Sequence, residues 1–471
     1  MYPDHSAAAF IAKLEVYSSS QLVETINGYN VLYASLLDSQ MGPLDRMGPL
    51  SIVAGTDLDA QSNTVNFSRG GINMTYGNTY TFAVPLVSGI IGTNLNKMLP
   101  VGLLQDCRLE ITWENNANAI ISATNTAVST NVWTVTSAEL VLQVLTLNSD
   151  VHNMIANKDT IMISSESYRN YNTVLNAANT SDNIILPLKF TSIKSLLNVY
   201  RLQNNMNTFN NASLTSRRNP FASTGATVPN IQWLLGNVYA PAVPLRSVAE
   251  IYSEYSKALH SLGNVNNKTV LNRQTYDQAV EPTFYGAVIN LANTSNVVSA
   301  IATNGQITCT STAGFEVGQP ITFYGTNSSL GQVQFGGVNG TFVPGTTTVN
   351  PTTYYISSIV SSTVFTIALT PQGFTQMTVA TAINTQTTLF LVTKEFYAQQ
   401  TPSFVMGLNT DTMYQASNNS MSGINSTAGN CFLNATYSAA TPTGGQRFDA
   451  WAHYDFLIMI DPHSKQMSIR V

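Results

Sequence analysis

The chain has 471 residues, of which only 10% are charged, and its formal net charge at pH 7 is -5. Ordinary soluble proteins have about 25% charged residues; here 48 Asn, 44 Ser and 55 Thr take their place and make up nearly a third of the chain. The sequence contains no Lys/Arg-rich run, which argues against a nucleic-acid-binding arm, and its 44% hydrophobic content argues against a disordered polar tract. Such a composition is typical of extracellular or assembly proteins made of strands and wide loops.

The first predicted element is an amphipathic helix near the N-terminus, from Ser6 to about Tyr17. It places Phe10, Leu14 and Tyr17 on one stripe, which could pack under the chain's own sheets or touch a membrane or a partner protein. Asp4 and His5 stand where a secretory signal would have basic residues, so we expect no signal peptide. We therefore expect synthesis in the cytosol.

Short β-branched or aromatic runs, separated by Asn, Ser and Gly clusters, then predict a series of strands. Side chains alternate clearly in one of them: Leu109, Ile111 and Trp113 face one way, so we expect Trp113 in the core. The predicted strands of this part cover residues 50–53, 80–87, 108–113, 132–147, 160–164, 184–190 and 195–202.

Few helices are expected after the N-terminal one. The clearest covers residues 247–262, where apolar residues recur at helical spacing. Ser247 is its expected N-cap, with Glu250 three residues later, and Gly263 its expected end. A shorter helix is predicted at about 93–99, before Pro100.

Composition changes sharply in the last third of the chain. Between Glu281 and Lys394 the only charged residue is Glu316. Thr/Gly/Val-rich strands are predicted there at 307–310, 319–324, 352–359, 364–369 and 388–392. We expect a small β domain inserted into a loop of its host, whose flanking strands, near 285–291 and 393–398, would lie close together.

Residues that could support chemistry are sparse. The five histidines form no metal-binding spacing, and Cys107, Cys309 and Cys431 are too far apart for a zinc site or a disulfide framework, so free buried thiols are expected. No catalytic, cofactor-binding or metal-binding residues are predicted, no cofactor is expected and the chain is not expected to be an enzyme. The only adjacent basic pair, Arg217-Arg218, is expected in a solvated loop or a subunit contact rather than a nucleic-acid site.

Several segments, taken in order, resemble major capsid proteins of the double jelly-roll lineage, most of all those of polinton-like viruses and virophages. One of these segments is Gln232-Trp-Leu-Leu-Gly236, which is followed by Pro241, Pro244 and the helix predicted at 247–262. Within the insertion, 317–323, 354–356 and 364–367 resemble a small β module of phage structural proteins. The resembling segments outside the insertion cover residues 82–92, 97–100, 108–114, 167–171, 184–190, 195–201, 232–262, 422–427, 432–433, 453–461 and 466–471.

This resemblance implies an all-β fold of two consecutive eight-stranded jelly-roll barrels with a few short helices and a small β domain inserted in a loop of the second barrel. The expected divisions are 1–210 for the first barrel with its N-terminal helical segment, 211–245 for the linker, 246–297 and 393–471 for the second barrel, and 298–392 for the surface insertion.

The resemblance also implies a structural protein that trimerises into pseudo-hexagonal capsomers of an icosahedral shell of a DNA virus. Its location would be the virion capsid, after synthesis and assembly inside the host cell. Its partners would be itself as a homotrimer, neighbouring capsomers, and penton, minor capsid or cement proteins. An internal membrane or the genome beneath the shell, and the host-cell surface through the insertion, are further partners to consider.

Two other classes were weighed. A trimeric β-rich viral spike or tail-fibre receptor-binding protein is the main alternative, but such fibres usually show a repeated shaft pattern, and none is visible here. A secreted carbohydrate-active enzyme or lectin-like sandwich would need a signal peptide and aromatic-plus-carboxylate clusters, which the sequence lacks.

Overall fold

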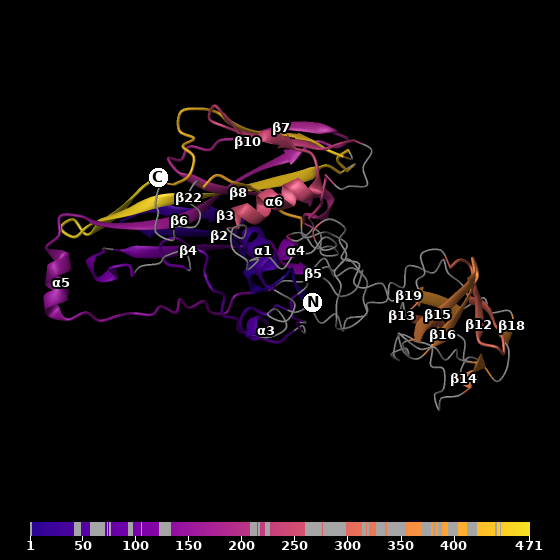
Figure 1. The fold of residues 1–471 in the computed structure, drawn as a ribbon. Helices are drawn as coiled ribbons and strands as arrows, with labels where there is room; N and C mark the ends of the chain where they lie inside the picture. Colours follow the sequence, from indigo (N-terminus) through magenta and orange to yellow (C-terminus); the bar gives the residue numbers. More distant parts are fainter. Residues whose placement is uncertain are drawn as a thin grey trace. The chain divides into compact units, whose positions relative to one another are not determined.

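The computed structural model divides the chain into two compact units (Figure 1). Unit 1 contains residues 1–59, 66–281 and 399–471, and unit 2 contains residues 60–65 and 282–398. The structure describes residues 2–41, 49–56, 71–72, 74, 77–92, 98–104, 106–121, 133–207, 214, 217–221, 227–259, 276, 298–312, 317, 320–325, 335–336, 354–368, 378–379, 383–384, 389–393, 404–411, 422–438, 440–442 and 444–471.

Unit 1 is built mainly from three antiparallel sheets around one continuous hydrophobic core. The first sheet has the order β3 (Gln21–Asn27), β2 (Ile11–Ser18), β4 (Cys107–Trp113). The second contains β10 (Val238–Leu245), β9 (Asn230–Leu235), β21 (Cys431–Thr436) and β7 (Ser181–Leu186). The third contains β20 (Met406–Asn409), β8 (Ile193–Leu202), β22 (Gln446–Asp461) and β23 (Gln466–Arg470), with β6 (Ile161–Leu175) also paired to β22. β1 (Tyr2–Pro3) and β5 (Ile120–Ile121) form a separate short pair.

The long strand β22 organises unit 1. It pairs with β6 over its length, from Gln446 opposite Leu175 to Ile460 opposite Ile161. It also pairs with β8 and β23. β21 likewise pairs with β7 and β9. Strands from the ranges 1–210 and 393–471 therefore share two sheets, and the expected boundary between two barrels does not separate sheets here.

The predicted helix at 247–262 is present as α6 (Val248–Ala258). The backbone N–H of Glu250 donates to the Ser247 side chain at 3.2 Å, and the backbone N–H of Arg246 donates to the Glu250 carboxylate at 2.6 Å. This reciprocal capping explains why the helix begins where the sequence predicts. Ile251, Tyr255 and Ala258 are its buried apolar residues that face the core. The helix end predicted at Gly263 lies outside the described residues, as do most of residues 93–99.

The predicted N-terminal helix is wrong. A short 3-10 helix, Ala7–Phe10, leads directly into β2, in which Leu14 and Val16 are fully buried at alternate positions. β2 is paired on both sides, by β3 and β4. This non-local pairing outweighs the helical spacing, because strand preference depends strongly on context.

Three segments predicted as strands do not form strands in the structure. Residues 50–53 lie in helix α3 (Pro49–Ala54). Residues 80–87 are extended with alternating exposure, but they form no described strand, and Pro85 has no N–H to donate to a ladder. Residues 133–147 are described without regular secondary structure. The other helices among the described residues of unit 1 are α1 (Tyr29–Gln40), α4 (Asn116–Ala119), α5 (Ser149–Ala156) and the 3-10 turns Val101–Leu103 and Gln203–Asn205.

Unit 2 contains a seven-stranded antiparallel sheet. Its order is β18 (Ile383–Asn384), β11 (Val298–Ile301), β12 (Gln306–Cys309), β16 (Val364–Ala368), β15 (Tyr354–Ser361), β13 (Pro320–Gly325) and β19 (Leu389–Thr393). A second pair is formed by β14 (Phe335–Gly336) and β17 (Thr378–Val379). All five strands predicted in this region are confirmed within one to two residues; the expected flanking strands, near 285–291 and 393–398, lie outside the described residues except for Thr393.

Two observations concern residue types rather than topology. Cys107, Cys309 and Cys431 are free thiols, as expected; Cys309 and Cys431 are buried, but Cys107 is exposed, contrary to the expectation of a buried thiol. Among the described residues, no helix has both the length and the apolar character required to cross a membrane.

Candidate functional site: an exposed apolar arm

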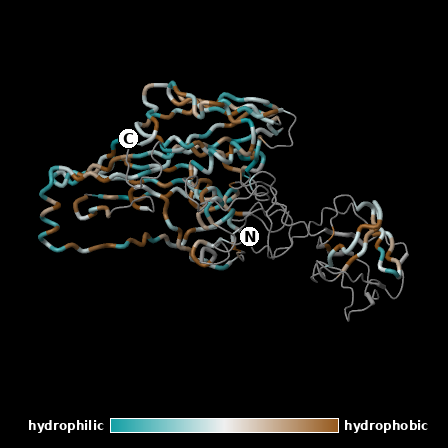
Figure 2. Tube along the Cα trace, viewed as in Figure 1, coloured by the Kyte–Doolittle hydropathy of each residue, from teal (hydrophilic) through white to brown (hydrophobic). Residues whose placement is uncertain are grey.

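Between β4 and β6 the chain carries a segment that differs from the rest of unit 1. Every side chain from Thr134 to Asp150 is exposed. We call residues 134–147 the apolar arm, because its exposed side chains include Leu140, Val141, Leu142, Val144, Leu145 and Leu147. Val141 is 90% exposed and Val144 78% exposed. Figure 1 draws the arm as a plain coil leading into α5, and Figure 2 shows hydrophobic stretches along it.

The sequence of the arm suits a strand. It contains no Gly or Pro, and its only charged residue is Glu139. In an extended chain, successive side chains point to opposite faces. Val141 and Leu145 then lie on one face and Leu142 and Val144 on the other, so both faces are apolar. This pattern is typical of strands covered on both faces. None of the described strands pairs with the arm.

Aromatic contacts fix the start of the arm. The ring centroid of Trp133 lies 4.7 Å from that of Phe10 and 6.2 Å from that of Trp113, the latter in an edge-on arrangement. At the other end, α5 (Ser149–Ala156) follows at once, with Val151 and Met154 exposed. Trp133 therefore places the start of the arm beside the end of β4 in space. Exposed apolar side chains continue from the arm into α5.

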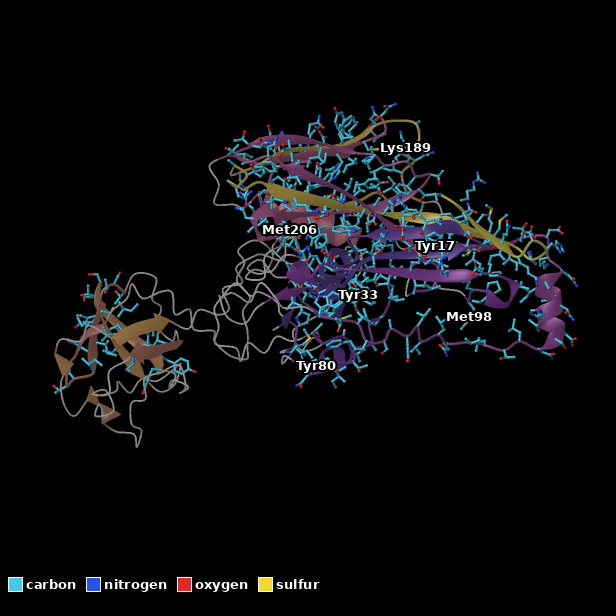
Figure 3. All side chains as sticks on the ribbon, turned by 180° about the vertical axis from the view of Figure 1, so that it is seen from behind. Tyr17, Tyr33, Tyr80, Met98, Lys189 and Met206 are labelled. Carbon is cyan, nitrogen blue, oxygen red and sulfur yellow. The ribbon has the colours of Figure 1, made fainter. Side chains whose placement is uncertain are left out.

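β4 itself is an edge strand. β2 pairs with it from Ile11 opposite Trp113 to Ser18 opposite Cys107. No other strand among the described residues pairs with β4. Arg108 lies 4.8 Å from the ring centroid of Tyr17, which Figure 3 labels on β2, and it forms a 3.1 Å ion pair with Glu110. The charges on this edge are thus paired.

The expectation that Trp113 lies in the core is wrong. Leu109 and Ile111 are half-buried and pack against the core, as predicted, but Trp113 is 40% exposed. The register between β2 and β4 shifts between Ile11 and Lys13. The extra residue of this bulge, Ala12, is on β2, so the regular pairing is disrupted at the end of β4 where Trp113 lies.

Charged groups in the interior of unit 1 form ion-pair networks. Glu166 on β6 accepts from Lys194 on β8 and lies 3.0 Å from His453 Nε2 on β22. The hydrogen bond from His453, with the charges of His453 and Lys194, lowers the pKa of Glu166 to about 2 although burial opposes this. Lys194 is also 3.3 Å from Asp455. The network ties three strands of one sheet together.

Ser195, His453 and Glu166 also form a line that invites a catalytic comparison. Ser195 Oγ lies 3.4 Å from His453 Nδ1, and His453 Nε2 lies 3.0 Å from Glu166. A nucleophile must reach its substrate. Ser195 is only 1% exposed and its neighbours are sheet residues, so this arrangement cross-links β6, β8 and β22 rather than presenting a nucleophile.

Another buried carboxylate sits between β3 and β6. Glu24 accepts hydrogen bonds from Ser88, Ser167 and the backbone N–H of Gly89. Burial raises its pKa in spite of these bonds. Ser88 and Gly89 belong to one turn and Ser167 to β6, so Glu24 holds the turn at 88–89 against the sheet.

Arg217 is not in a solvated loop, contrary to expectation. It is fully buried and pairs with Asp38 at 2.8 Å, and His5 Nε2 lies 2.9 Å from the same carboxylate. Arg218 is half-buried and donates to Gln446 and to the backbone carbonyl of Ala440. Sequence cannot distinguish these from solvated arginines, because Asp38 lies far away in the chain.

No catalytic, cofactor or metal residues were predicted. Within the part of the chain that the structure describes, no group of three or more His, Cys, Asp or Glu residues could hold a metal ion. The sequence predicts a strand at 132–147, but it could not show that no described strand pairs with this segment. Solvent exposure of apolar residues on a long segment is the feature that marks it as a candidate interaction surface.

Comparisons with known proteins give similarity at the level of structure alone. No family model matches the chain. No curated protein matches it either. Over its whole length it is similar to a chain in the structure of the Sputnik virophage, with 12% identity, a TM-score of 0.40 and 76% of that chain covered.

Two further solved structures are similar over the whole chain. One is PBCV-1 VP54 fitted into a reconstruction of the virophage Sputnik, with 10% identity, a TM-score of 0.38 and 86% of that chain covered. The other is the PBCV-1 virus capsid, with 12% identity, a TM-score of 0.31 and 85% of that chain covered.

Proposed function

We propose that the chain is a structural major capsid protein of a DNA virus, located in the virion capsid and not an enzyme. It forms trimers that act as pseudo-hexagonal capsomers of an icosahedral shell. The two jelly-roll barrels implied by the sequence resemblance belong to the same proposal. Synthesis and assembly take place inside the host cell.

The observation that carries the proposal is the agreement between the resembling segments and the strands. Four segments that resemble capsid proteins lie in β4, β8, β22 and β23, except for the last residue of the first and of the fourth: 108–114, 195–201, 453–461 and 466–471. β8, β22 and β23 are neighbours in one antiparallel sheet and β4 lies at the edge of another, which supports an all-β capsid fold.

Composition supports assembly as the task. A shell subunit buries much of its surface against neighbours, and burying a charge without a partner is costly. With only 10% charged residues and many Asn, Ser and Thr side chains, the chain can hydrogen-bond across such contacts at lower cost. The exposed arm adds apolar side chains that such contacts between copies would also bury.

Partners follow from the same proposal. Contacts with other copies come first, and penton, minor capsid or cement proteins and an internal membrane or genome would meet other faces. Unit 2 would decorate the outside of the particle, contact neighbouring capsomers or attach to the host-cell surface. Its seven-stranded sheet and near absence of charge support a separately packed module.

The test is the mass and shape of the purified full-length chain. Light scattering at micromolar concentration should give three times the 50.9 kDa chain mass, and negative-stain images should show hexagonal outlines. A monodisperse monomer that forms no larger species would contradict the proposal. Elongated fibres would favour a spike or tail-fibre protein instead.

A further inference from the structure

The apolar arm and the free edge of β4 are complementary features of one chain. The arm supplies a stretch of backbone that no described strand pairs with, and β4 supplies an edge that no described strand pairs with. Unpaired edges and unpaired strands tend to join, because each backbone N–H and C=O gains a partner. Strand addition of this kind is a common mode of protein recognition.

We propose that the arm of one copy adds as a strand to the free edge of β4 in a neighbouring copy. This inference rests on the proposed trimer, which it explains at the level of residues. A contact between two different surfaces is head-to-tail, and head-to-tail contacts generate rings when the rotation closes. A self-complementary contact would give a dimer instead.

The chemistry of both surfaces supports this occupant. The arm is apolar on both faces and has one charge, Glu139, so a charged or strongly hydrated partner does not match it. β4 offers half-buried Leu109 and Ile111 and the overhanging Trp113 on one face. On the other face the Arg108–Glu110 pair leaves no net charge against the incoming strand.

In the isolated chain, the arm lies exposed beside solvent. Val141 and Val144 are 90% and 78% exposed, which is unfavourable for a folded monomer but is satisfied by a second copy. Trp133 holds the root of the arm beside Trp113 at the end of its own β4, so the arm is presented from a fixed point. The arm's own β4 edge then remains available to another neighbour.

The first test uses the double variant V141D/V144D of the full chain. The control is V317D/V360D, which changes two valines of unit 2 that are 65% and 51% exposed. Because Val141 and Val144 make few contacts within the chain, the variant should fold with unchanged circular dichroism. Its trimer should dissociate at a concentration about a hundredfold higher or more, since an unpaired carboxylate is costly to bury.

The outcomes separate the two proposals. A wild-type trimer with a folded, monomeric V141D/V144D and a trimeric control supports the arm contact. A wild-type trimer with an equally stable V141D/V144D trimer overturns the arm contact and leaves the capsid proposal intact. A wild-type monomer overturns both.

Cross-linking to the natural Cys107 gives a second measurement, independent of the aspartate variants. Cys107 is exposed on β4, whereas Cys309 and Cys431 are buried. Cysteine is placed in turn at each position from 139 to 145, and the assembled protein is oxidised at low concentration. A disulfide forms only where the two Cα atoms come within about 7 Å.

We expect bands of linked dimers and trimers on a non-reducing gel for cysteines at some arm positions. These bands should be absent when Cys107 is replaced by Ser (C107S). A disulfide only within one chain would show that the arm folds onto its own β4 and would overturn the inference. The inference is also overturned if the variants form a wild-type-like trimer but no arm position forms a disulfide with Cys107.

Discussion

Trp451 offers a direct test of how unit 1 is held together. It is fully buried in the middle of β22, and its indole N–H donates to the backbone carbonyl of Asn27, at the end of β3, at 3.1 Å. Trp451 therefore connects the third sheet to the first. Replacing it with Ala removes the buried ring and leaves a cavity, which costs about 3–5 kcal/mol. Loss of the hydrogen bond adds about 1 kcal/mol, for a total of about 4–6 kcal/mol.

Denaturant unfolding followed by tryptophan fluorescence measures this loss in unit 1 alone. All four Trp residues, Trp113, Trp133, Trp233 and Trp451, lie in unit 1, so unit 2 contributes no tryptophan signal. Three reporters remain in the W451A variant. Unfolding is performed below the concentration at which copies associate, because association adds to apparent stability.

The matched control is Trp113→Ala, which removes the same side chain from a position that is 40% exposed. Its expected cost is below about 2 kcal/mol, since much less apolar area is buried there. If both variants lost the same stability, or if W451A lost less than about 2 kcal/mol, the packing described for β22 would be incorrect.

Three further results are expected. Asp449→Ala should destabilise unit 1 by about 3–5 kcal/mol, because it leaves the buried Arg201 guanidinium without its carboxylate. In the native chain Arg201 donates to Asp449 at 2.7 and 2.9 Å. Asp461→Ala is the control, and equal losses of stability in the two variants would contradict this prediction. Glu166→Gln should cost about 1–2 kcal/mol at pH 7, a figure reduced for screening because the side chain is 36% exposed. The pKa of Glu166 is lowered from 4.5 to about 2 in the folded chain, so its contribution is complete above pH 4.5 and is lost as the pH falls towards 2; unfolding at a series of pH values checks this, and a difference that grows in acid would refute it. Replacing residues 298–393 with a short Gly/Ser linker should leave unit 1 folded and able to form trimers, as light scattering would show; loss of the unit 1 unfolding transition would mean that the segment belongs to the same core.

The sequence by itself determined several elements well. β4, β8 and five strands of unit 2 lie where β-branched or alternating runs predict them. β22 and β23 contain segments that the resemblance to capsid proteins singled out. α6 begins directly after Ser247, because its capping residues are neighbours in the chain. Free buried thiols were also predicted correctly for Cys309 and Cys431, but not for Cys107, which is exposed. All these signals are local: side-chain period, turn residues and caps act within a few positions.

Only the tertiary structure decided which segments pair. The segment predicted as a helix at 6–17 forms mostly β2, because β3 and β4 pair with it on both sides. Arg217 is buried because it pairs with Asp38, which is distant in the sequence. The same holds for β22, whose partners β6 and β8 come from the first half of the chain. The arm shows the converse: a sequence typical of a buried strand stays exposed, because strand formation needs a paired edge and no described strand of this chain pairs with the arm.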